Sequence, residues 1–225
     1  MISARPTAII FDMDGLLLDT ERVGCETMIA AMAEIGFAMT ADQYHPLIGL
    51  PKDAERAVFT DQFGPGFSAE HDYPAMRAVQ TRIKAERYGD KRPLKAGVAA
   101  VIAAAEALGL PCAVATSSDR ATTLAHLGHM DLRRHMAAVV TRDDVAHGKP
   151  FPDLYLAAAA ALGMAPADCL ALEDSYNGVR AAHAAGVPVV MVPDILPPTA
   201  EMRELALAIA PDLAVVAGWL LHLAR

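Results

Sequence analysis

The chain has 225 residues, 54% of them hydrophobic, which is enough for one large domain or a domain with a smaller companion and argues against general disorder. Its formal net charge of −8, from 19 basic and 27 acidic residues, argues against a nucleic-acid backbone as the main partner. A small anionic ligand in a locally positive pocket stays compatible with that charge. Three widely separated cysteines, no leader-like N-terminal segment and no uninterrupted long apolar stretch predict a cytoplasmic protein outside the membrane.

Short apolar runs recur along the chain, and each is bounded by polar or turn residues. They occupy residues 8–11, 112–116, 137–141, 169–172 and 187–192. Ala-rich stretches with helical character lie between them, at residues 98–108, 154–162 and 176–185. Continuous apolar runs indicate strands that are buried on both faces, and their alternation with helices indicates a parallel sheet. We therefore predict an α/β protein with a Rossmann-like parallel sheet as its core.

The segment from about residue 19 to residue 88 breaks this alternation because it contains no clear buried strand. Helical character is found instead at residues 25–35, 52–63 and 73–87. We predict a core domain formed by residues 1–18 and 89–225, and a small α-helical cap domain formed by residues 19–88. Ligands of open parallel sheets bind beyond the carboxyl ends of the strands, so an insertion at the first strand is expected to exclude water and select substrates.

Two acidic residues follow the first apolar run, in the sequence "AIIFDMDGLLLDTE". Asp12 and Asp14 would repel each other if both were ionised and unpaired. A hard divalent cation with oxygen ligands, such as Mg²⁺, removes that repulsion. The alternative interpretation is an ordinary turn, in which Asp and Gly are common.

Polar residues also follow three later apolar runs. The sequence "CAVATSSDR" places Thr116 and Ser117 at a strand end, where hydroxyl and N–H groups can hold an anion, although an ordinary helix N-cap uses the same residue types. The sequence "HGKPFPD" places Lys149 before two prolines, where its ammonium can neutralise a phosphate or simply be solvated. The sequence "LALEDSYNG" places Glu173 and Asp174 at another strand end, where acidic residues also suit a helix N-terminus.

Taken in order, "DMDGLLLDTE", "TSSDR", "GKPFPD" and "LEDSYNGVRAAHAAG" closely resemble the haloacid dehalogenase superfamily of phosphoryl-transfer enzymes. The resemblance covers nearly the whole chain. The position of the cap resembles the subgroup with a small helical cap, which includes beta-phosphoglucomutase, phosphoglycolate phosphatase and sugar-phosphate phosphatases. The resemblance implies an Mg²⁺-dependent phosphatase that acts on a small phosphorylated metabolite. We expect a monomer, with a homodimer as the alternative.

The resemblance also implies roles for the residues that bind and transfer the phosphoryl group. Asp12 would be the nucleophile that attacks phosphorus and becomes an aspartyl phosphate. Asp14 would protonate the leaving alcohol and then deprotonate the attacking water. Thr116 and Lys149 would bind the transferring phosphoryl group, and Ser117 is a further candidate for substrate binding.

The metal ligands implied by the resemblance are Asp12, the backbone carbonyl of Asp14, and Asp174, with Glu173 close by or acting through water. Such a site makes physical sense because the nucleophile and the phosphate are both anionic. A bound Mg²⁺ and the ammonium of Lys149 would offset their repulsion.

The predicted cap offers fewer candidates. Gly49, in "LIGLPKDAER", matches a glycine-containing loop that faces the active site in the subgroup. Lys52 lies where some relatives carry a basic residue that contacts substrate, although a surface lysine is the alternative. Beta-phosphoglucomutase carries a histidine shortly after the "DT" dipeptide, and the matching position here is Gly24.

Three other functions can be compared with a phosphatase. A phosphomutase would use the same site but return the phosphoryl group to a sugar, and Gly24 disfavours this because glycine cannot replace the coupling role of the histidine. A receiver-type signalling domain combines acids, a hydroxyl and a lysine, but its acceptor Asp lies on a middle strand and it carries no cap. A dehalogenase needs no second acid two residues after its nucleophile, so Asp14 favours a phosphate substrate.

Overall fold

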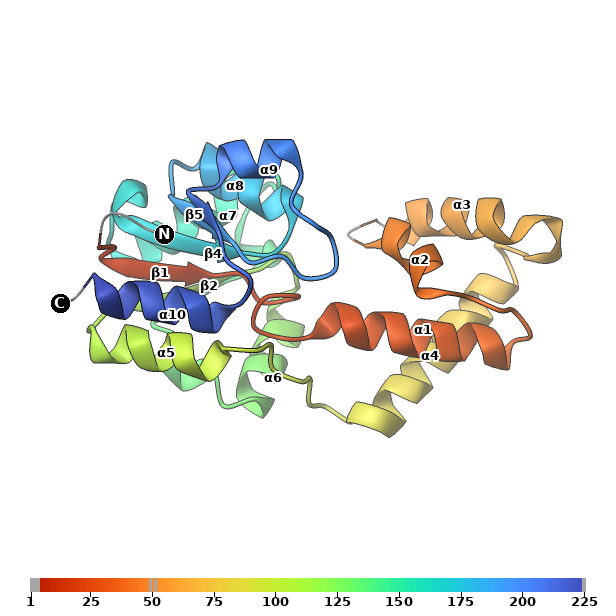
Figure 1. Cartoon of the computed structure of the whole chain (residues 1–225). Coiled ribbons are helices and arrows are strands. Elements are labelled where there is room, and N and C mark those ends of the chain that lie inside the picture. Colours follow the sequence, from red (N-terminus) through yellow and green to blue (C-terminus); the bar gives the residue numbers. More distant parts are fainter. Residues whose placement is uncertain (1–4, 49, 51, 224–225) are drawn as a thin grey trace. The chain divides into compact units, whose positions relative to one another are not determined.

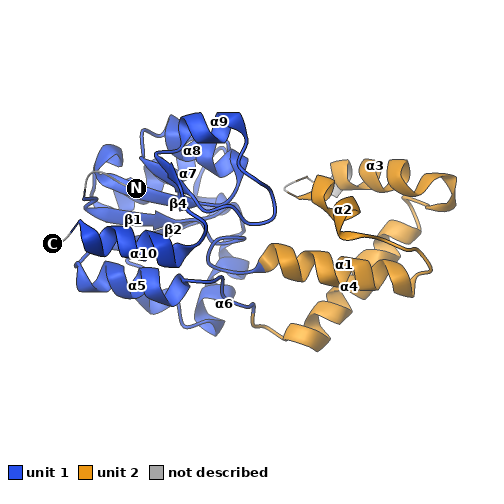
Figure 2. Ribbon diagram, viewed as in Figure 1, with its two compact units in different colours: residues 1–19, 92–225 blue, residues 20–91 orange. Residues whose placement is uncertain are grey.

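The structure of the protein is a computed structural model, and it describes residues 5–48, 50 and 52–223. The chain forms two compact units (Figure 2). The first comprises Met1–Asp19 and Arg92–Arg225, and the second comprises Thr20–Lys91. The second unit starts one residue later and ends three residues later than the cap expected at residues 19–88.

The described residues of the first unit form a six-stranded parallel sheet with the order β3-β2-β1-β4-β5-β6. Its strands are β1 (Ala8–Phe11), β2 (Cys112–Ala115), β3 (Ala138–Val140), β4 (Cys169–Glu173), β5 (Val189–Met191) and β6 (Ala208–Ile209). In the centre, Phe11 of β1 pairs with Val114 of β2 and with Leu172 of β4. The predicted parallel α/β sheet is therefore confirmed.

Helices cover both faces of this sheet (Figure 1). They are α5 (Val98–Ala107), α6 (Arg120–His129), α7 (Asp153–Leu162), α8 (Tyr176–Ala184), α9 (Ala200–Leu205) and α10 (Leu213–His222). Successive residues of a strand point to opposite faces. Ile9 and Phe11 accordingly pack in one hydrophobic cluster with α5 and α10, whereas Ala8 and Ile10 pack in another with α7 and α8. Burial on both faces explains why the strands read as continuous apolar runs.

The second unit is helical, with α1 (Thr20–Glu34), α2 (Ala41–Tyr44), α3 (Lys52–Phe63) and α4 (Asp72–Tyr88). The aromatic rings of Phe59, Phe63, Phe67 and Tyr73 form a cluster of ring contacts, and all but Phe63 are buried. Helix α1 begins five residues before the expected start at residue 25. Short 3₁₀ helices occur at His45–Leu47, Gly64–Gly66, Arg133–His135, Arg142–Asp144 and Pro166–Asp168.

Two segments of the first unit run side by side where the chain leaves and re-enters it. Leu18 and Leu94 form an antiparallel bridge. On either side of it, the N–H of Asp19 donates to the carbonyl of Pro93 at 2.8 Å, and the N–H of Lys95 donates to the carbonyl of Leu17 at 3.0 Å. The paired segments fix the end of the acidic motif to the start of the second half of the core.

Across residues 5–48, 50 and 52–223, every helix is too short or too polar to cross a lipid bilayer.

Candidate active site

The candidate site lies at the edge of the sheet where strands β1, β2 and β4 end. Asp12 directly follows β1, Thr116 directly follows β2, and Glu173 is the last residue of β4. All three residues are buried. The N–H of Asp12 donates to the carbonyl of Leu172 in β4 at 3.0 Å, and the N–H of Thr116 donates to the carbonyl of Val140 in β3 at 3.0 Å. Because the strands are parallel, residues distant in the sequence meet at one edge.

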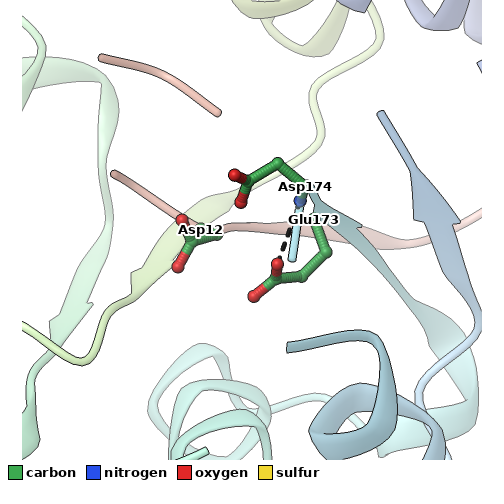
Figure 3. Close-up of side chains that lie close together, drawn as sticks. All are labelled: Asp12, Glu173 and Asp174. Carbon is green, nitrogen blue, oxygen red and sulfur yellow. Dashed lines mark hydrogen bonds between the residues drawn. The ribbon is translucent and has the colours of Figure 1, made fainter. Parts of the chain in front are cut away.

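Three carboxylates converge at this edge. Asp12, Glu173 and Asp174 each offer an oxygen, and these oxygens lie within 4.8 Å of one another (Figure 3). Burial raises the pKa of Asp12 to about 8 despite the neighbouring lysine ammonium. Burial, and then the Glu173 carboxylate, raise the pKa of Asp174 well above its usual value. Gly15, with a φ of +86°, leaves room for Asp174, because a Cβ at position 15 would clash with that carboxylate.

Lys149 is the cation of the cluster. Its Nζ contacts Oδ1 of Asp12 and lies 2.5 Å from Oε1 of Glu173, and its side chain is only 6% exposed. Burial alone would lower the pKa of Lys149, but the Asp12 and Glu173 carboxylates outweigh burial and raise it above its usual value. Lys149 is therefore a buried charge with two anionic partners, and the interpretation as a solvated surface lysine is wrong.

Glu173 accepts hydrogen bonds at both of its carboxylate oxygens. Oε1 accepts from Nζ of Lys149 and from the hydroxyl of Tyr155 at 2.9 Å. Oε2 accepts from the N–H groups of Asp174 (2.9 Å) and Ser175 (3.0 Å) and from the Ser175 hydroxyl (3.0 Å). A Cβ at Gly178 would clash with the same carboxylate. Glu173 is thus held in one position and is well placed to orient Lys149.

Tyr155 was missed at the sequence level. It lies on α7, is fully buried, and places its ring 5.3 Å from Nζ of Lys149. The only signal in the sequence was the residue type, because a tyrosine hydroxyl usually has a hydrogen-bond partner when it is buried. The sequence could not say that this partner would be Glu173.

The second carboxylate of the acidic motif, Asp14, contacts a serine. The hydroxyl of Ser118 donates to Oδ2 of Asp14 at 2.7 Å, and the N–H of Ser118 donates to Oγ1 of Thr116 at 3.1 Å. Ser117, the expected substrate-binding serine, is exposed, and its role stays a prediction. The serine that contacts an expected catalytic residue is the next one along the chain.

The cap candidates are less well defined. Helix α3 begins at Lys52, whose side chain lies outside the described part of the structure, as does Gly49. The substrate contact of Lys52 and the placement of the Gly49 loop toward the active site stay predictions.

The charges of the site favour a divalent cation. With every group ionised, Asp12, Glu173 and Asp174 carry three negative charges and Lys149 carries one positive charge, which leaves two negative charges in a buried cluster. Carboxylate oxygens are the ligands that hard cations prefer. The donor set therefore fits Mg²⁺ in both charge and chemistry.

Comparisons with known proteins identify the family of this chain. A model of the haloacid dehalogenase-like hydrolase family matches residues 9–192. Protein CbbY from Cupriavidus necator is 38% identical over 218 residues, which cover 92% of this chain and 85% of that protein. Hexitol phosphatase B from Escherichia coli K12 is 32% identical over 190 residues, which cover 83% of each chain. The solved structure of a mutant CbbY from Rhodobacter sphaeroides, in complex with xylulose-(1,5)-bisphosphate, is 28% identical, has a TM-score of 0.66, and covers 93% of this chain and 95% of that chain.

The chain belongs to the haloacid dehalogenase-like hydrolase family, as its motifs predict. This result confirms the predicted resemblance and identifies the protein as an enzyme of the hydrolase class.

Proposed function

We propose that the protein is an Mg²⁺-dependent phosphatase that hydrolyses small phosphorylated sugars or related metabolites through an aspartyl phosphate on Asp12. One observation supports this most strongly: Asp12 lies at the end of the central strand in direct contact with the buried ammonium of Lys149. A carboxylate held against a cation and beside two further acids suits nucleophilic attack on an anionic phosphate better than it suits any structural role.

The reaction is proposed to run in two steps. In the first, a carboxylate oxygen of Asp12 attacks phosphorus, the ester bond to the alcohol breaks, and the alcohol leaves with a proton from Asp14. In the second, Asp14 removes a proton from water, the water oxygen attacks phosphorus, and the acyl-phosphate bond breaks to release phosphate and regenerate Asp12. Thr116 and Lys149 are proposed to hold the transferring phosphoryl group through a hydroxyl and an ammonium.

The metal would be held by Asp12, Asp174 and the backbone carbonyl of Asp14. Glu173 is the least available donor because both of its oxygens already accept hydrogen bonds, so we place it next to the metal with a water between them. When bound, Mg²⁺ would supply positive charge that offsets the repulsion between the nucleophile and the phosphoryl oxygens.

The local structure at Gly24 favours hydrolysis over sugar phosphomutase activity. Gly24 is buried in α1, and a Cβ at this position would clash with the hydroxyl of Tyr44. That hydroxyl donates to Glu21 at 3.1 Å. The space that a histidine would need is therefore filled by Tyr44, and the coupling that we attribute to the histidine of beta-phosphoglucomutase is missing here.

The substrate class rests on the relatives. A hexitol phosphatase and a CbbY protein that binds xylulose-(1,5)-bisphosphate both point to phosphorylated sugars. A phosphoglycolate-type substrate is the second candidate within the same class of small phosphate esters.

A two-part assay tests the proposal. Phosphate release from a panel of sugar phosphates and phosphoglycolate is measured with Mg²⁺ and with excess EDTA, and the proposal requires turnover that the chelator abolishes. Beta-glucose 1-phosphate with a trace of the bisphosphate is then supplied. Rapid formation of glucose 6-phosphate with almost no free phosphate would establish a mutase and refute the phosphatase assignment.

A further inference from the structure

Ser118 connects two residues of the proposed site. Its hydroxyl donates to Oδ2 of Asp14 across 104 positions of sequence, at 2.7 Å. Its N–H donates to Oγ1 of Thr116 at 3.1 Å. One residue therefore contacts both the group assigned to proton transfer and the hydroxyl assigned to phosphoryl binding.

The backbone of Ser118 is fixed on both sides. Its N–H donates to Oγ1 of Thr116, and its carbonyl accepts from the N–H of Arg142 at 3.1 Å. The next residue, Asp119, caps α6 by accepting from the N–H of Thr122 at 2.8 Å. The hydroxyl of Ser118 consequently extends from a rigid strand-to-helix turn.

The backbone at Asp14 is already held, because Asp14 forms a bridge with Leu18 and the N–H of Gly15 donates to the carbonyl of Leu18 at 2.8 Å. The orientation of the Asp14 carboxyl group is set separately, by its side-chain contacts. A carboxyl group has two oxygens, and proton transfer needs one of them at a defined position. A hydrogen bond from Ser118 to Oδ2 selects the side-chain rotamer and leaves Oδ1 to carry the transferred proton.

We propose that Ser118 is a positioning residue, whose hydroxyl orients Asp14 for proton transfer to the leaving group. This inference rests on the proposed phosphatase function. It makes a distinct claim: the Ser118 hydroxyl matters most when the departing alcohol needs a proton.

The test compares two leaving groups of nearly the same shape. Phenyl phosphate releases phenolate, which needs protonation, whereas 4-nitrophenyl phosphate releases a much more stable anion. Release of phenol or nitrophenol is followed in a single turnover with excess enzyme and Mg²⁺, so that only the first chemical step is observed. Circular dichroism and thermal unfolding of each variant establish that it is folded.

Ser118→Ala is expected to slow phenol release roughly tenfold and nitrophenol release less than about twofold, because the lost hydrogen bond serves general acid catalysis. Ser118→Thr keeps the hydroxyl and should restore most of the phenol rate. In an Asp14→Asn background, which has already lost the proton donor, Ser118→Ala should have no further effect on phenol release.

Equal slowing of both substrates by Ser118→Ala would overturn the inference, because a general disturbance of the site does not distinguish leaving groups. Normal rates for Ser118→Ala beside a defective Asp14→Asn enzyme would also overturn it while leaving the proposed function intact. Absence of phosphate release from every ester by the wild-type protein would refute the proposed function itself, and this inference with it.

Discussion

Replacing Lys149 by methionine would test the electrostatics of the site, because the substitution keeps an unbranched side chain that is only one atom shorter and removes its charge. The structure gives the size of the effect. Lys149 is 6% exposed and contacts two carboxylates, those of Asp12 and Glu173, which would both stay buried without a cation. Removing one partner of a buried ion pair costs about 3–5 kcal/mol in the free energy of unfolding. Protonation of Asp12, whose pKa is already raised to about 8, should keep the loss near the lower end of that range.

The assay is urea-induced unfolding followed by circular dichroism at pH 7 in EDTA, and then in Mg²⁺. We expect Lys149→Met to lower the free energy of unfolding by about 3 kcal/mol in EDTA. Saturating Mg²⁺ should stabilise the variant as well as the wild type, since a ligand that binds only the folded state stabilises it. With Mg²⁺ present, turnover of phosphate esters by Lys149→Met should fall sharply relative to the wild type.

Lys95→Met provides the matched control. Lys95 also pairs with two aspartates, Asp194 and Asp19, but its side chain is 25% exposed. We expect a loss of about 1 kcal/mol or less, because more exposed pairs are better solvated. If Lys149→Met were no more destabilising than Lys95→Met, the described charge cluster would not be held as a buried ionic network, and the reasoning would be refuted.

Two further predictions concern packing and pH. Gly178→Ala should lower the free energy of unfolding by about 1–3 kcal/mol and slow turnover, because the new Cβ would clash with Glu173. The control is Gly218→Ala in α10, where the new Cβ meets no atom within 4 Å and the change should be neutral or stabilising. Urea unfolding of both variants measures the difference. Hydrogen bonds from Arg120, and then from Thr141, lower the pKa of Asp144 to about 2, so its stabilising contribution is present above about pH 4 and lost as the pH falls toward 2. Asp144→Asn should therefore cost about 1 kcal/mol at pH 6 after allowance for solvent screening, and the difference from wild type should close near pH 2; a pH-independent difference would contradict the assignment.

Much of the candidate site was predictable because parallel strands bring their carboxyl ends together. Asp12, Thr116 and Glu173 each follow or end an apolar run, and the sheet order places β1 between β2 and β4. That geometry needs no knowledge of side-chain packing. The burial of Lys149 was predictable only through the family resemblance, since a lone lysine in a loop has no local signal.

Other features depended on tertiary structure. Two adjacent hydroxyls follow Thr116, and only the turn into α6 determines that Ser118, rather than Ser117, contacts Asp14. Likewise, the packing of α7 on the sheet decides that Tyr155 bonds to Glu173. The first turn of α1 contains charged residues and Gly24, which weaken the apolar periodicity, so its start at Thr20 was not expected. Strand β6, Ala208–Ile209, is too short to give a pattern.

The central claim is that Asp12 carries the phosphoryl group, and chemical trapping of the intermediate tests it most directly. Enzyme mixed with a phosphorylated sugar and Mg²⁺ is quenched in acid and reduced with borohydride, which converts an aspartyl phosphate to homoserine, and the modified residue is located by peptide mass spectrometry. We predict homoserine at position 12 in the wild type, none without substrate, and neither modification nor turnover in a folded Asp12→Asn variant. Continued phosphate release by Asp12→Asn, or trapping at another residue, would contradict the account.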